Sequence, residues 1–113
     1  MKHQKTKSEK VLGDFLAAVP RDSYLISDKF TPQCADPTAD NAVTALIPLA
    51  KSGKIGKIGL SNHSLAEIKE AAGILSKEGL KISAIQNHYS LLNRSSETSG
   101  ILDYCTDPDR MGY

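Results

Sequence analysis

Helix-type and strand-type patterns alternate along this chain, and the alternation constrains the fold more than any other feature. Apolar residues recur at helical spacing from Ser8 to Val19, and a short apolar run of strand type follows over Ser23–Ser27. The same succession occurs twice more along the sequence. Such alternation with short links predicts an α/β fold with parallel strands.

Breaking and capping residues set the expected boundaries in the first half of the chain. Ser8 is the expected N-cap of the first helix, and Pro20 ends that helix because proline disfavours helical geometry in the residue before it. A second helical pattern runs over residues 38–50. Pro48 lies inside this pattern, and we expect it to kink or divide the helix because it removes a backbone hydrogen bond.

The second half carries a clearer helix signal. Ser64 and Glu67 have capping-box spacing at the start of a third helix, and Gly79 is expected to close it. We expect strands over 57–61 and 81–86 and a last short helix over 97–105, with a polar tail over 1–7 and an irregular tail over 106–113. Three strands in all are too few to form a closed barrel.

Polar side chains lie at the carboxyl ends of the three expected strands. They are Lys29, then Ser61 and Asn62, then Gln86 and Asn87. In parallel α/β folds, loops at the carboxyl ends of strands carry the chemistry. A lysine there can assist proton transfer, and serine and amide side chains can bind a planar amide or carbonyl because they offer donors and acceptors. The alternative is that polar residues collect at strand ends because these ends meet water.

Charge and composition exclude several kinds of partner. A net charge of +1 and a pI of about 7.8 are well below the strongly positive charge and high pI that are typical of nucleic-acid-binding domains. No apolar run approaches the roughly 20 residues of a membrane span, and no secretory signal is evident. We therefore expect a cytoplasmic chain in which Cys34 and Cys105 are free thiols. Its three histidines share no metal-ligand spacing with the cysteines, so we expect no metal site.

Four segments, in order, resemble the aldo/keto reductase family. Residues 51–62 (KSGKIGKIGLSN) resemble the family's segment leading into its fifth strand. Residues 8–13 (SEKVLG) resemble its helix after the second strand, and residues 24–30, ending in Lys-Phe, resemble its third strand. Residues 82–94 (ISAIQNHYSLLNR) resemble its sixth strand and the following loop. Four motifs in the family's order make the resemblance strong, and it covers about residues 8–105.

The resemblance implies a fold and a function. The family forms a (β/α)8 barrel that binds NADP(H) and reduces aldehydes and ketones with a Tyr, Lys, Asp and His tetrad. It implies Lys29 as the catalytic lysine, and Ser61, Asn62 and Gln86 as ligands of the nicotinamide carboxamide. A complete barrel needs about 250 residues, so 113 residues imply an incomplete barrel with about three parallel strands and flanking helices.

Three of the four family tetrad residues have no counterpart in this sequence. The Asp and Tyr precede the position of Ser8, the His falls where residues 38–46 and 47–62 adjoin directly, and residues after Cys105 are expected to leave the family pattern. We therefore expect an oxidoreductase fragment that does not turn over carbonyl substrates. NADP(H) affinity should be small, because binding would have to order an open scaffold.

Two other interpretations stay open. One is a non-catalytic interaction protein, because an incomplete parallel sheet exposes strand edges that can pair with another chain. Such a protein would self-associate or dock to a full-length relative. The other is an interrupted gene product with no selected function.

Overall fold

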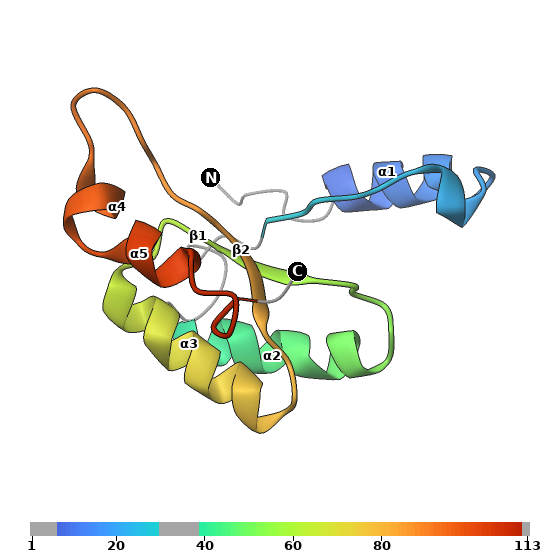
Figure 1. Ribbon diagram of the computed structural model, residues 1–113. Coiled ribbons are helices and arrows are strands. Elements are labelled where there is room, and N and C mark those ends of the chain that lie inside the picture. The colour runs from blue at the N-terminus through green and yellow to red at the C-terminus, as the bar shows by residue number, and fades with distance from the viewer. Residues whose placement is uncertain (1–6, 30–38, 112–113) are drawn as a thin grey trace.

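The computed structural model describes residues 7–29 and 39–111. The element order is α1 (Lys7–Leu16), the 3-10 helix η1 (Arg21–Ser23), α2 (Ala39–Lys51), β1 (Ile58–Ser61), α3 (Leu65–Lys77), β2 (Ile82–Gln86), α4 (Ser95–Thr98) and α5 (Ile101–Cys105). Strands β1 and β2 pair in parallel, and helices α2 and α3 lie together beside them (Figure 1). The α/β class and the parallel pairing are therefore confirmed.

The core lies between the sheet and its helices. Ile58 and Leu60 of β1 and Ile82 of β2 alternate with more exposed neighbours, as strands with one buried face do. They meet residues of α3, α2, α5 and the tail, namely Ile68, Ala71, Leu75, Val43, Ile101, Tyr104 and Met111. The helices thus cover one face of the sheet, whereas Gly59, Ala84 and Gln86 on the other face are exposed.

A close backbone approach fixes the position of β1 against β2. The register shifts between Ile58 and Gly59, which pair with Ile82 and Ala84 respectively, so one extra residue of β2 lies between the pairs. A Cβ atom on Gly59 would lie 3.1 Å from the Ala84 carbonyl oxygen. Glycine is therefore favoured at position 59 because a side chain would crowd the neighbouring strand.

Helix α3 follows its sequence signals closely. The Ser64 backbone N–H donates to Glu67 Oε2 at 2.7 Å, and the Glu67 N–H donates to Ser64 Oγ at 3.4 Å. The expected capping box is therefore confirmed. At the other end, Gly79 has a φ of +72°, a conformation that glycine adopts without a Cβ penalty.

The strand expected over residues 23–27 is wrong. Arg21–Ser23 forms a 3-10 helix, and no strand is assigned over residues 24–29, although Tyr24 is extended. Leu25 is 97% exposed and Ile26 is 50% exposed. The run is apolar, but no strand of the described residues pairs with it, so its backbone gains no ladder of hydrogen bonds. The described sheet has two strands instead of the three expected.

Three other local expectations need correction. Helix α1 begins at Lys7, so Ser8 lies inside its first turn instead of capping it. Helix α2 contains Pro48 and is not divided by it. The last helix is two short helices, because Gly100 takes a φ of +81° between α4 and α5.

The C-terminal tail takes part in the fold. Met111 is only 9% exposed and forms an isolated parallel bridge with Ile82, on β2. The sequence of this tail has no periodicity, so it did not predict the contact. A single buried residue beside a strand forms no alternating pattern that the sequence could show.

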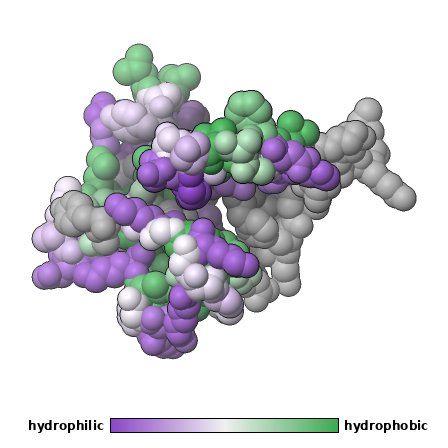
Figure 2. All heavy atoms as spheres, turned by 90° about the vertical axis from the view of Figure 1, so that its right-hand side faces the viewer, coloured by the Kyte–Doolittle hydropathy of each residue, from purple (hydrophilic) through white to green (hydrophobic). Residues whose placement is uncertain are grey.

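Helix α1 presents an uncovered apolar side. Val11, Leu12 and Phe15 are 66%, 44% and 71% exposed. The helix lies apart from α2 and α3 in Figure 1. Figure 2, which views the molecule from the right-hand side of Figure 1, shows apolar side chains uncovered at the surface. The helical periodicity of α1 therefore predicted its conformation but not its burial.

Candidate functional site at the carboxyl ends of the strands

Ser61 and Gln86 meet at the end of the sheet. They are register partners on β1 and β2, and each is the last residue of its strand. Ser61 is half-buried and Gln86 is exposed. A hydroxyl and a carboxamide therefore lie side by side on one edge, as the parallel pairing predicted.

Asn62 follows Ser61 in an unusual backbone conformation. Its φ is +56°, and it is the one non-glycine residue with a positive φ in the described ranges. Asparagine tolerates this region better than most side chains because it can hydrogen-bond locally. The Asn62 N–H donates to the Gln86 carbonyl at 3.2 Å, and Asn62 Oδ1 accepts from the His88 N–H at 2.8 Å. Asn62 therefore links the two strand ends.

Asn87 makes the reciprocal connection from β2 to β1. Its Nδ2 donates to the His63 carbonyl at 3.0 Å, and its Oδ1 accepts from the His63 N–H at 3.3 Å. Asn87 is among the polar strand-end residues of the sequence, but the family resemblance implies no role for it. A usable signal was present, because an Asn-His pair follows each strand, at 62–63 and at 87–88.

His63 has a buried ring nitrogen. Its Nδ1 is shielded from solvent and has no hydrogen-bond partner among the described residues. The side chain as a whole is half-buried, directly before the N-cap of α3. The imidazole therefore packs at the strand-end edge next to Asn62.

Lys29 is not joined to this edge. It is exposed, and its backbone N–H donates to Asp28 Oδ1 at 2.8 Å. Its ammonium group makes no ion pair or hydrogen bond with another residue in the described part of the chain. The structure thus brings together Ser61, Asn62 and Gln86 of the four expected site residues and leaves Lys29 apart from their hydrogen-bond network.

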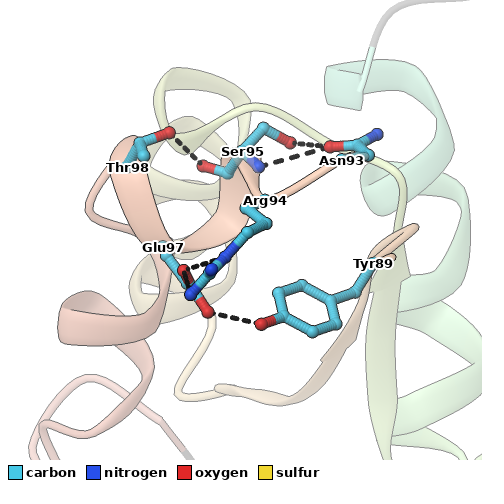
Figure 3. A network of polar contacts seen from close by, with 6 residues as sticks. All are labelled: Tyr89, Asn93, Arg94, Ser95, Glu97 and Thr98. Carbon is cyan, nitrogen blue, oxygen red and sulfur yellow. Dashed lines mark hydrogen bonds and ion pairs between the residues drawn. The ribbon is translucent and has the colours of Figure 1, made fainter. Parts of the chain in front are cut away.

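The loop after β2 is held by a polar network (Figure 3). Arg94 Nε donates to Glu97 Oε2 at 2.8 Å, and the Tyr89 hydroxyl donates to Glu97 Oε1. This hydrogen bond to the Glu97 carboxylate raises the pKa of Tyr89, because removing the phenol proton would leave two like charges in contact. At the tip, Leu91 and Leu92 are almost fully exposed, at 96% and 99%.

Metal and membrane sites find no support in the described residues. No three histidine, cysteine, aspartate or glutamate side chains of residues 7–29 and 39–111 gather as metal ligands would. None of the helices in those ranges combines the length and apolar content that crossing a membrane requires. Cys105 is a free, half-buried thiol whose pKa is raised by burial, and Cys34 lies outside the described residues.

The edge has the donors and acceptors that a planar amide requires. Asn62 Oδ1 is engaged by His88, which leaves its Nδ2 as a donor, and the Gln86 amide and Ser61 hydroxyl face the same edge. These residues fit the carboxamide end of a nicotinamide cofactor. Polar side chains at the carboxyl ends of parallel strands are typical of the sites of barrel-type and doubly wound α/β proteins.

The chain belongs to the aldo/keto reductase family: residues 32–111 match the sequence profile described as "Aldo/keto reductase family". The match includes most of the tail, so the expectation that residues after Cys105 leave the family pattern is wrong. Residues 8–31, which contain Lys29, lie outside the match. The resemblance of that segment therefore stays a prediction.

Two curated proteins of the fission yeast Schizosaccharomyces pombe are similar to this chain. One, named "Probable pyridoxal reductase 2", is 39% identical over 67 residues, which are 59% of this chain and 19% of that protein. The other, named an uncharacterized oxidoreductase, is 35% identical over 79 residues, which are 66% of this chain and 22% of that protein. The chain thus spans about a fifth of the length of these relatives. No solved structure matches it significantly.

Proposed function

We propose that this chain carries the part of an aldo/keto reductase that recognises the carboxamide of NADP(H). Ser61, Asn62 and Gln86 would bind that amide, and the cofactor would supply the hydride in the family's reduction of aldehydes and ketones. The observation that carries the proposal is the parallel register, which pairs Ser61 with Gln86, together with the two hydrogen bonds that tie Asn62 to the end of β2.

We propose that the 113-residue chain does not reduce carbonyl compounds by itself. Lys29, the counterpart of the family's catalytic lysine by resemblance, is exposed to water, and among the described residues it makes no hydrogen bond to the amide edge. A lysine assists proton transfer best when its surroundings are desolvated and its partner is held in place. The exposed face around Gly59, Ala84 and Gln86 supplies no such enclosure.

Titration by NMR tests the binding proposal. The expected result is weak, millimolar binding of NADPH, with chemical-shift changes at the Ser61, Asn62 and Gln86 amides. Substituting Ser61→Ala should weaken binding several-fold because one hydrogen bond is lost. Ser76→Ala, at an exposed position on α3, is the matched control and should leave binding unchanged. Shift changes that spare the three amides would refute the site.

Turnover measurements test the inactivity proposal. NADPH oxidation should not exceed the protein-free rate with a panel of aldehydes and ketones. Activity that Lys29→Met abolishes and Lys54→Met preserves would refute the proposal, because Lys54 is another exposed lysine outside the amide edge.

A second candidate function is strand-edge interaction with another chain. Tyr24 is extended, and residues 24–29 pair with no strand in the described part of the chain. Leu25 is 97% exposed, and among the same residues β1 has a strand partner on one side only. An apolar extended segment and a free edge in the same chain favour self-association or docking to a full-length relative. Sedimentation should show concentration-dependent association that Leu25→Asp weakens more than Leu91→Asp. A monomer at every concentration counts against this function.

A further inference from the structure

We infer that Asn87 is a positioning residue: its two bonds to His63 hold the backbone directly after Asn62, so that Asn62 can present its free amide nitrogen to a ligand. The inference rests on the proposed recognition of an amide at this edge. It concerns a residue for which the family resemblance implied no role.

The Asn87 side chain makes hydrogen bonds to the His63 backbone of the kind that a residue of a neighbouring strand would make. Its amide accepts from the His63 N–H and donates to the His63 carbonyl, at 3.3 and 3.0 Å. Two such bonds to one residue are what a neighbouring strand would supply. Both bonds are partly buried, so water competes for these backbone groups less than it would at an open loop.

Asn62 makes the opposite bond, from the β1 loop to the β2 loop. Its Oδ1 accepts from the His88 N–H at 2.8 Å. The two asparagines therefore reach across in opposite directions, and each fixes the backbone that follows the other strand. This arrangement, which we call the asparagine clasp (Asn62 and Asn87), supports the positive φ of Asn62 from both sides.

The His88 N–H determines the orientation of the Asn62 amide. A backbone N–H can only donate, so the atom that faces His88 must be the oxygen. The Asn62 Nδ2 is then left without a hydrogen-bond partner among the described residues. Asn62 is therefore set to donate to the carbonyl oxygen of a bound carboxamide, while Ser61 and Gln86 can satisfy the amide nitrogen.

Backbone amide exchange measured by NMR tests the clasp directly. In Asn87→Ala, the His63 N–H loses its acceptor, and its exchange should become roughly tenfold or more faster. Asn87→Asp keeps an acceptor for this N–H but loses the donor to the His63 carbonyl and sets two oxygens against each other, so its protection should lie between those of the wild type and Asn87→Ala. Ser76→Ala, at an exposed position on α3, is the control and should not change exchange at His63.

NADPH titration of the same variants tests the positioning role. Asn87→Ala should weaken the response of the Ser61 and Asn62 amides several-fold, although Asn87 itself makes no ligand contact in this proposal. Unchanged exchange at His63, or unchanged ligand response in Asn87→Ala, would overturn the inference. An equal loss of protection throughout α3 and β2 would also overturn it, because the role would then be general to the fold.

The two proposals can fail separately. If the wild-type chain shows no NADPH response, the proposed function fails, whereas exchange at His63 still shows whether Asn87 holds the loop. If the wild type responds and Asn87→Ala responds equally, the proposed function stands and the positioning role is refuted.

Discussion

The backbone at Asn62 allows a quantitative test of how this edge is built. Asn62→Ala removes the acceptor of the His88 N–H, which costs about 1 kcal/mol for a typical hydrogen bond. The φ of +56° adds about 1 kcal/mol for a side chain that cannot bond locally. The expected loss of unfolding free energy is therefore about 2 kcal/mol.

Asn62→Gly loses the same hydrogen bond but relieves the backbone strain. It should be less stable than the wild type but more stable than Asn62→Ala by about 1 kcal/mol. Urea unfolding followed by circular dichroism measures both differences. At Asn93, which has no positive φ, the order should reverse, with glycine less stable than alanine. If Asn62→Ala is as stable as Asn62→Gly, or more stable, the strain argument is refuted.

Three further predictions concern the scaffold of the site. Leu75→Ala should cost about 2–5 kcal/mol of unfolding free energy in urea, because the side chain is fully buried in the core. Gly59→Val should destabilise the sheet by calorimetry, whereas Gly56→Ala should not, because only the Cβ at position 59 meets a neighbouring backbone oxygen. Glu67, whose pKa is lowered from 4.5 chiefly by the Ser64 N–H, should stabilise the fold above the unfolded pKa. The stability advantage of the wild type over Glu67→Gln should therefore shrink as the pH falls through the folded pKa, and a pH-independent difference would contradict this.

Local signals predicted most of the elements between residues 39 and 105. The capping box at Ser64 and Glu67 needs only neighbouring residues, so its sequence spacing was sufficient to find it. The two strands also carried their own pattern, and their boundaries were predicted within one residue. Polar residues directly after each strand then indicated the edge at Ser61, Asn62 and Gln86.

Segments whose state depends on distant partners were predicted less well. Residues 23–27 have strand composition, but a strand needs a neighbour, and none of the described residues supplies one. Met111 has no periodic context, yet it is buried because it meets Ile82 on β2. Pro48 is expected to kink or divide α2; the helix continues through it, so the division is wrong and the kink stays a prediction.

The sequence by itself determined the capping box of α3, the two strands β1 and β2 and the family, because each depends on patterns within the chain's own order of residues. The roles of Ser61, Asn62 and Gln86 stay a prediction. Only the tertiary structure decided how the amide edge is held together. Asn62 and Asn87 are 25 positions apart, and their crossed bonds to His88 and His63 exist because the parallel register brings the two strand ends side by side. The spacing of residues along the chain does not predict that register, because the register is set by the packing of β1 and β2 against α3.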